Sequence, residues 1–393
     1  MAHAYEVVIG GGAVMGSSIA YHLAMQPGFS GRVLVIDKDM TYRKAASSLS
    51  LSSVRQQFSS AINIRVGLYG AAFLRRARET LAVDGEAPDL SITENGYLYL
   101  AGESGAAALT QNHRTQVAEG ADVLLLDRPG LEERFPFLNL EGVAAAGFGR
   151  TGEGWFDGYT LMQAFRRKAR ALGVVYREDD IAAFERQGRC IVAVRLASGE
   201  RVACGAFVNA AGASGARRLA AEMGLDIPVR SRKRCVFSFH AHANIERCPL
   251  VIDLSGVYVR PEGGGWLCGM SPPEAEDPDC DDFEVVWPQF DEVIWPALAH
   301  RIPAFEALRV QSAWAGHYDL NLFDHNAIVG RAPGLDNVYL ATGFSGHGMQ
   351  QSPAVGRALA ELIAEGRYLT LDLGEFACER LAEGRPLVER NVI

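Results

Sequence analysis

Four glycines and one acid near the start of the chain carry the clearest chemical signal. Gly10, Gly11, Gly12 and Gly16 follow a short apolar stretch, and Asp37 ends a second one. Glycines let backbone N–H groups approach a pyrophosphate, which then lies on the positive end of a helix. An acid after the second strand accepts hydrogen bonds from a ribose hydroxyl and disfavours a 2′-phosphate. These residues predict a dinucleotide site that is not selective for NADP.

The elements that must position these residues are also visible. Residues 7–9 read as a strand, about 15–25 as an apolar helix, and the run before Asp37 as a second strand. This order is a βαβ unit with a dinucleotide fingerprint. The fingerprint has three glycines in the spacing GxGxxG, and this chain can be aligned with it in two ways. If Gly10 is the first glycine, the third one comes one residue late; if Gly11 is the first, Ala13 replaces the middle glycine. We prefer the second reading, which costs one methyl group near the phosphates.

Composition limits the function classes. At 393 residues the chain exceeds the usual size of one core, so two domains are expected. The net charge is −9 and no basic run is longer than 230–234, which argues against nucleic acid as a partner. The seven cysteines include no CxxC pair, so we expect no metal site and a reduced, cytoplasmic protein. Residues 7–25 fit a buried strand and helix better than a membrane span.

Two further segments can reach a nucleotide. The hydroxyl-rich stretch after Asp37 reads as a loop over a bound cofactor, leading into a helix at about 59–80. Near the C-terminus, a strand at 338–340 runs into a glycine-rich turn and a helix that begins around His347. A helix N-terminus is a fixed positive dipole. By contrast, 90–101 reads as a β-hairpin turning at 95–96, and 227–311 reads as antiparallel strands.

Three motifs resemble one family. The N-terminal IGGGAVMGSSIAYHLA, the central VNAAGA and the C-terminal ATGFSGHGMQQSPAVGRALAELI resemble the D-amino-acid oxidase superfamily of FAD-dependent oxidoreductases. The resemblance covers nearly the whole chain. It implies a mixed α/β fold, with a GR2-type Rossmann FAD-binding domain and an interleaved antiparallel-sheet substrate domain. The expected FAD-binding segments are 1–84, 141–222 and 312–393, and the expected substrate-domain segments are 85–140 and 223–311.

The resemblance also implies where FAD binds. The pyrophosphate is expected at the first glycines, the ribose at Asp37, and the flavin ring near the serine-rich loop and the C-terminal helix start. The full set of expected FAD contacts is Gly11, Gly12, Ala13, Gly16, Asp37, Lys38, Ser47, Ser48, Ala211, Gly212, Gly316, Gly343, Ser345, Gly346, His347, Gly348, Met349 and Gln350.

Departures from the family's pattern change what is expected. Sarcosine oxidases attach flavin through a cysteine just after the strand near Trp314, and Gly316 stands at that position, so we expect non-covalent FAD. The lysine that activates oxygen in sarcosine oxidase falls near Leu267 here, which favours a dehydrogenase over an oxidase. The electron acceptor is not identified by the sequence.

The family's contacts to a substrate carboxylate are also replaced. A lysine after the GFSGHG motif is Gln350 here, an arginine three residues beyond Arg55 is Phe58, and the arginine of glycine oxidase falls near Trp314. No bidentate clamp of the expected kind remains. The candidates to replace these contacts, or to act as a base, are Arg55, Tyr258, Arg260 and His317. Arg260 fits a carboxylate ligand and an exposed strand position about equally.

The resemblance therefore implies an FAD-dependent oxidoreductase that acts on the C–N bond of a small amine or amino acid, by hydride transfer to flavin N5. The alternative is an assembly or scaffold flavoprotein with structural FAD and little turnover. A third, weaker reading is an NAD-dependent enzyme, because Asp37 suits NAD equally well; the C-terminal helix start argues against it.

Overall fold

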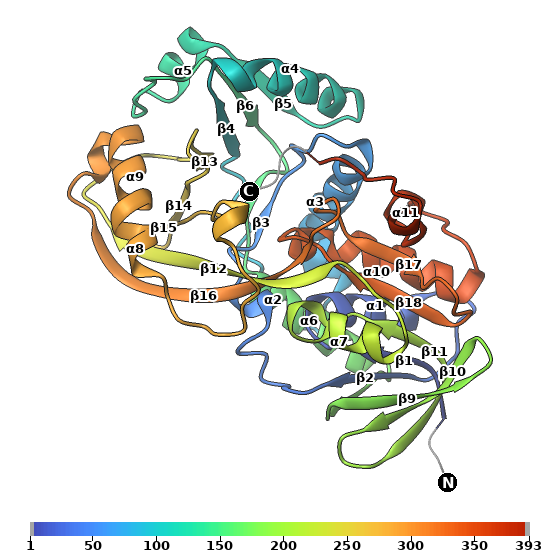
Figure 1. Ribbon diagram of the computed structural model, residues 1–393. Helices are drawn as coiled ribbons and strands as arrows, with labels where there is room; N and C mark the ends of the chain where they lie inside the picture. The colour runs from blue at the N-terminus through green and yellow to red at the C-terminus, as the bar shows by residue number, and fades with distance from the viewer. Residues whose placement is uncertain (1–3, 390–393) are drawn as a thin grey trace.

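The computed structural model describes residues 4–389 and contains two eight-stranded sheets and one two-stranded sheet. This confirms the expected mixed α/β fold class. Figure 1 shows the first sheet in the lower right of the view and the second in the upper left. The long strands β12 (Val229–His240) and β16 (Arg309–Asn321) belong to the second sheet and cross the middle of the view.

The first sheet is built around β1 (Ala4–Gly10), which pairs in parallel with β2 and β11. The strands of this sheet are β17 (Ile328–Arg331), β18 (Val338–Thr342), β11 (Arg201–Asn209), β1, β2 (Val33–Asp37) and β8 (Val175–Glu178), in that order, with β9 (Ile181–Gln187) and β10 (Cys190–Leu196) joined through β11. Ligands of such sheets bind at the carboxyl ends of the strands where the strand order reverses. Here that place is the end of β1.

The second sheet is antiparallel except where β13 pairs in parallel with β4. Its order is β16, β12, β15 (Gly265–Gly269), β14 (Tyr258–Glu262), β13 (Leu250–Ile252), β4 (Tyr97–Ala101), β6 (Ala145–Gly149) and β5 (Val123–Leu126). The two-stranded sheet pairs β3 (Ser53–Val54) with β7 (Gly154–Trp155).

The helices cover both sheets. They are α1 (Val14–Met25), α2 (Ala46–Leu49), α3 (Ala61–Thr80), α4 (Glu103–Ala118), α5 (Arg128–Arg134), α6 (Gly158–Ala171), α7 (Gly212–Glu222), α8 (Trp287–Gln289), α9 (Trp295–Arg301), α10 (Gly348–Glu365) and α11 (Glu379–Ala382). Short 3₁₀ turns lie at η1 (Glu274–Glu276), η3 (Pro303–Phe305) and η4 (Gly374–Phe376), and a π-helical turn, η2 (Phe290–Ile294), joins α8 to α9. Along the described residues no helix is long and apolar enough to cross a membrane.

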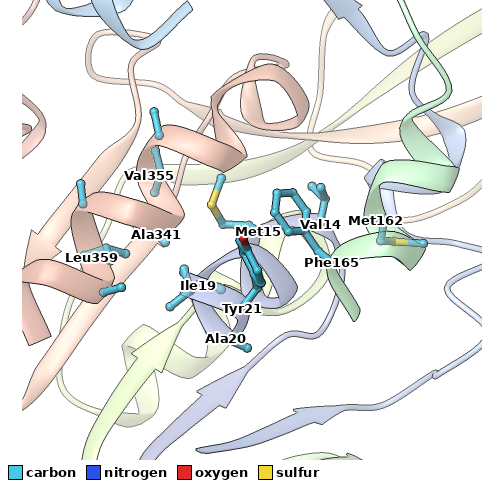
Figure 2. Packing of buried hydrophobic residues seen from close by; sticks show 14 of the residues in the cluster. Val14, Met15, Ile19, Ala20, Tyr21, Met162, Phe165, Ala341, Val355 and Leu359 are labelled. Atoms are coloured by element: carbon cyan, nitrogen blue, oxygen red, sulfur yellow. The ribbon is translucent and has the colours of Figure 1, made fainter. Parts of the chain in front are cut away.

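The apolar helix α1 is buried between two later helices. Figure 2 shows Ile19 of α1 facing Leu359 and Val355 of α10, while Met162 and Phe165 of α6 pack on its other side. Each of the labelled side chains is almost completely buried. Because α1 is buried on all sides, both neighbouring helices contribute to its stability.

Two sequence expectations need correction. The predicted hairpin at 90–101 is wrong, because β4 takes its antiparallel partner from β6 and residues before Gly96 stay outside the sheet. Sheet membership also differs from the expected domain segments at two places. Residues 145–149 (β6), expected in the FAD-binding part, belong to the second sheet, and so does the whole of β16, up to Asn321. The long β12–β16 pairing carries that sheet past the expected boundary.

The C-terminal segment is fixed to the start of α3 through one buried carboxylate. Glu389 accepts hydrogen bonds from the backbone N–H and hydroxyl of both Ser59 and Ser60, at 2.7–3.2 Å. A carboxylate at a helix N-terminus also interacts favourably with the helix dipole.

Replacing this carboxylate should weaken the fold. We expect Glu389→Ala to lower the free energy of unfolding by about 2 kcal/mol, since it removes a helix cap and leaves buried N–H donors unpaired. Chemical denaturation of the FAD-loaded protein measures this. Glu383→Ala, an exposed acid of the same C-terminal region, is the control and should change stability little. Equal stability of Glu389→Ala and the control would contradict the expectation.

Candidate functional site

A long cavity of about 670 Å³ begins at the carboxyl end of β1 and reaches into the space beside β12 and β16. Three helix N-termini contribute to its wall: Ala13 and Val14 at α1, Ala211 and Gly212 at α7, and Gly346 and Gly348 at α10. Each helix N-terminus carries positive dipole charge. The cavity therefore suits an elongated molecule that is anionic at several points.

Two glycines shape the start of this cavity. Gly11 has φ +100°, and a Cβ added there would lie 2.3 Å from the carbonyl oxygen of Ala210. A Cβ on Gly16 would lie 1.8 Å from the carbonyl oxygen of Gly11. Neither position has room for a side chain. These are the first and third glycines of our preferred reading of the fingerprint.

Asp37 lies at the floor of the cavity beside these glycines. Its Oδ2 accepts a hydrogen bond from the Gly12 N–H at 2.7 Å, and its Oδ1 accepts one from the Asp39 N–H at 3.1 Å. Burial raises the pKa of Asp37, while these two N–H groups oppose that rise. The carboxylate is held in place and lines the cavity.

The cavity also brings together many of the other residues expected to contact FAD. Its wall includes Gly11, Ala13, Asp37, Lys38, Ser47, Ala211, Gly212, Gly316, Gly346, Gly348 and Met349. Gly12, Gly16, Ser48 and Gly343 are not part of its wall. Among the described residues no cysteine lines the cavity, in keeping with the expectation of non-covalent FAD. A glycine-lined start and three helix dipoles fit FAD.

His317 lies in this long cavity and not in the smaller one described next. It is 8% exposed, and its Nε2 has no hydrogen-bond partner among the described residues. Its ring meets Phe283 edge-on, with centroids 4.4 Å apart. Burial lowers the pKa of His317, so the ring is neutral at pH 7. A neutral imidazole at this place can offer one hydrogen bond to a molecule in the cavity.

A smaller chamber of about 60 Å³ shares part of its wall with the long cavity. The shared residues are Ser50, Leu51, Tyr258, Tyr318, Gly346 and Met349. The chamber adds Ser52, Ser53, Arg55, Tyr97, Leu250, Ser345, His347 and Gln350. His347 and Gln350, expected at the flavin, therefore face this chamber, as does Arg55. A chamber of this size next to the cofactor cavity suits a small substrate.

Arg55 is the cation of the chamber and is only 2% exposed. Its guanidinium donates to the Gln57 carbonyl at 2.5 Å and to Nε2 of His347 at 2.9 Å, and lies over the ring of Phe58 at 4.0 Å. Because a guanidinium only donates, Nε2 of His347 must be the acceptor, and the proton of that ring is on Nδ1. Burial and the Arg55 charge together hold the pKa of His347 well below its usual range.

Two phenols complete the shared wall. Neither the Tyr258 nor the Tyr318 hydroxyl has a hydrogen-bond partner among the described residues. Burial raises the pKa of both groups, so both stay protonated. Each therefore keeps an O–H donor for a bound molecule. Tyr318 also packs against Gly346, where a Cβ would lie 2.5 Å from its ring.

Arg260 has a different position from the one expected. It is buried, at 4% exposure, so it is not on an open strand face, and it lines neither cavity. Its guanidinium pairs with Glu262 and donates to the Leu51 carbonyl at 3.0 Å. Arg260 thus supports the loop that forms the shared wall, and its proposed role as a carboxylate ligand is not supported by this geometry.

Sequence reasoning missed two buried acids that shape the site. Asp319 accepts the Gly343 N–H at 2.8 Å and so fixes the turn that leads to α10; burial raises its pKa to about 6. Glu153 is completely buried and holds the segment after Arg55, accepting the Gln56 N–H at 2.6 Å and the Gln57 side chain at 2.7 Å. Glu153 lies between two glycines, which is no recognisable signal in a single sequence.

Glu153 should make stability depend on pH. Burial raises its pKa from 4.5 to about 7, against the opposing effect of its hydrogen bonds and of Arg55. The folded state therefore holds a proton that the unfolded state releases, and stability falls as pH rises from about 4.5 to about 7. The loss is roughly 3 kcal/mol.

We expect Glu153→Gln to remove this part of the pH dependence. Thermal unfolding at a series of pH values measures it, as the difference in Tm between wild type and variant. Between pH 5 and pH 8 the Tm of wild type should fall relative to the Tm of the variant. The buried Asp319 also titrates in this range, but it is present in both proteins and so does not affect the difference. Parallel curves would contradict the prediction.

Comparison with known proteins agrees with this geometry. The family described as FAD dependent oxidoreductase matches residues 6–362. The FAD-dependent oxidoreductase domain-containing protein 1 of Xenopus laevis is 42% identical, over 99% of this chain and 85% of its own length. The chain belongs to the FAD dependent oxidoreductase family.

Solved structures show the same fold. L-proline dehydrogenase from P. horikoshii superposes with a TM-score of 0.86 at 26% identity, covering 98% of this chain and 100% of its own. Glycine oxidase from Geobacillus kaustophilus superposes with a TM-score of 0.82 at 25% identity, covering 95% of this chain and 98% of its own. The protein is thus an FAD-binding oxidoreductase similar to these enzymes, and the resemblance stated from the sequence is confirmed.

Proposed function

We propose that this protein oxidises the C–N bond of a small amine or amino acid bound in the chamber next to the cofactor cavity. The observation that carries the proposal is the chamber's lining: Tyr258 and Tyr318 have unpaired O–H groups in the wall shared with the long cavity, and Arg55 adds a buried positive charge on the chamber side. When bound, FAD supplies the acceptor for the hydride of the substrate. The glycine oxidase and the L-proline dehydrogenase to which the chain is similar support this substrate class.

The residues of the chamber have separable tasks in this proposal. Arg55 attracts the anionic or polar end of the substrate, and the two phenols orient it. His347 is neutral, with Nε2 occupied by Arg55, so that this nitrogen does not accept the substrate's proton. The long cavity holds the cofactor through the glycines at α1, Asp37 and the N-terminus of α10, whose dipole stabilises negative charge.

We further propose a dehydrogenase rather than an oxidase, with the second sheet as the substrate domain. No lysine is present among the described residues that line the chamber, in line with the Leu267 replacement. The acceptor of the electrons is a separate, unidentified molecule. All seven cysteines are free, which supports a reduced, cytoplasmic setting.

Anaerobic reduction of the flavin tests the proposal. The protein is mixed with amines, N-methyl amino acids, L-proline and D-amino acids, and the visible flavin band is followed. We expect one class of these compounds to bleach the flavin band within seconds of mixing, and air to restore the band slowly. Glycine, sarcosine and D-alanine should reduce the flavin poorly, because Gln350 and Phe58 replace the family's clamp residues. Rapid bleaching by these three would contradict that part.

A scaffold function with structural FAD is the second candidate. One observation favours it: the Arg55 guanidinium already donates to Gln57 and His347, so part of its capacity serves the fold. If dithionite reduces the flavin but no member of the panel does, this candidate takes precedence.

A further inference from the structure

A second cavity, of about 640 Å³, lies apart from the cofactor site and shares no residue with it. It is a groove at one end of the second sheet, between the C-terminal end of α5, the end of β6 and the loop 244–247. Its floor is aromatic, with Phe135 and Phe148 buried and Phe137 half-buried. We call this feature the basic groove, for the reason that follows.

Unpaired arginines stand at the rim of the basic groove. Arg134 and Arg247 are exposed and have no ion-pair partner among the described residues. Among the described lining residues, the one acid without an ion-pair partner is Glu246. The other two charged lining residues form ion pairs: Glu94 pairs with Arg75, and Arg150 pairs with Asp122. The groove therefore combines an apolar floor with a positive rim.

A helical segment of the same half of the molecule has the opposite character. In the run from α8 through η2 to α9, Val286, Trp287, Val293 and Trp295 are 42%, 47%, 39% and 41% exposed. The two tryptophans lie eight residues, about two turns, apart and so emerge on roughly the same side. Exposed apolar groups gathered in this way usually mark an interaction surface. We call this segment the acidic helix.

The acidic helix carries no basic residue before His300 and Arg301 at the end of α9. Residues 271–293 contain nine Asp and Glu and no Lys, Arg or His. Asp291 and Glu292, between the two tryptophans, are exposed and have no ion-pair partner among the described residues. The acidic helix therefore combines exposed apolar groups with a negative rim, the complement of the basic groove.

Hydrogen bonds join the chain just after the groove to the end of α9. Asn139, just beyond the groove, donates its backbone N–H to the Arg301 carbonyl at 2.8 Å and its side chain to the His300 carbonyl at 3.1 Å. Leu131 of α5 and Leu298 of α9 share one hydrophobic core on the same side of the sheet. Figure 1 shows α5 at the top of the view and α9 below it at the left.

We propose that this face is the interface of a homodimer. In a two-fold dimer each patch contacts its counterpart reciprocally, so the acidic helix of each copy enters the basic groove of the other. Trp287 and Trp295 then cover the phenylalanine floor, and Asp291 and Glu292 meet Arg134 and Arg247. A dimer that placed the two acidic helices against each other would oppose like charges and is disfavoured.

Charge reversal with cross-rescue tests the proposal on the full FAD-loaded chain. Light scattering after size exclusion should give wild type a mass near twice the chain mass of 42.5 kDa. Arg134→Glu/Arg247→Glu should be monomeric, and so should Asp291→Lys/Glu292→Lys. An equimolar mixture of the two variants should be dimeric. In a dimer of either variant alone, helix and groove carry like charges, whereas in the mixed dimer each helix meets a groove of opposite charge.

The mixture guards against misfolding, because a misfolded variant would not be rescued. Arg78→Glu/Glu79→Lys, on the exposed side of α3, is the matched control and should remain dimeric. A monomeric wild type, a dimer that both reversals leave intact, a mixture that stays monomeric, or a control that dissociates would each overturn the proposal. If wild type is monomeric, the homodimer is excluded, and a different protein would be the partner to test for this face.

Discussion

Gly16→Ala is expected to be purified with little FAD. The added Cβ would lie 1.8 Å from the Gly11 carbonyl oxygen and 3.0 Å from its carbon, so the two backbone segments must separate. That movement displaces the Gly11 turn and the N-terminus of α1, both of which form the start of the cofactor cavity. We expect the apparent Kd for FAD to rise at least about 100-fold, corresponding to roughly 3 kcal/mol.

The ratio of flavin to protein absorbance gives the first measure, and titration of the apoprotein with FAD gives the Kd. Gly264→Ala is the matched control, because a Cβ there meets nothing within 4 Å and the residue has no positive φ. The control should keep wild-type FAD content. Full FAD content in Gly16→Ala would show that the fingerprint loop tolerates the separation and that this contact does not shape the cofactor site.

Arg55→Met is expected to keep FAD but lose substrate turnover. A hydrogen bond to a charged group contributes about 1.5–3 kcal/mol, so the rate of flavin reduction should fall roughly 10- to 100-fold. Loss of the Arg55 charge also removes one of the two main causes of the low pKa of His347, so a new ionisation should enter the pH profile. Stopped-flow reduction by the best member of the substrate panel measures both effects.

A second measurement does not depend on turnover. Acetate, as a small carboxylate, should perturb the flavin absorption of wild type at lower concentration than that of Arg55→Met. Arg55→Lys, which keeps the charge but not the planar fork, should fall between them. Arg78→Met, an exposed arginine of α3, is the control for losing an arginine elsewhere. Unchanged reduction rate and acetate response in Arg55→Met would leave Arg55 a purely structural role.

The cofactor half of the site could be predicted from the sequence because its signals are local. The glycines, the strand and helix that flank them, and Asp37 all lie within one βαβ unit, and the structure places them together. The same holds for Gly346 and Gly348, since a glycine-rich turn at the start of a helix is a short-range pattern.

The chamber could be predicted only in part, because its contacts are between residues far apart in the chain. Arg55 was recognised as a candidate, but its bond to His347 spans 292 positions and its supporting acid, Glu153, has no sequence signature. Arg260 shows the converse. Its place on a strand allowed a binding role, yet the register turns its side chain towards Glu262 and Leu51. Pairing partners of this kind depend on tertiary structure.

Residues near both ends of the chain line the cofactor cavity, so FAD can bind only after nearly the whole chain has been made. The hydroxyl of Ser18 in α1 donates to the carbonyl of Ser352 in α10, 334 residues later, and Gly348 closes the wall that Gly11 begins. A nascent chain on the ribosome therefore has an incomplete cofactor site until α10 has emerged. We therefore expect FAD to be loaded late in biosynthesis and to stabilise only the finished chain, by mass action. In cells short of flavin the protein should be synthesised at the normal rate but degraded sooner, so that less of it is present.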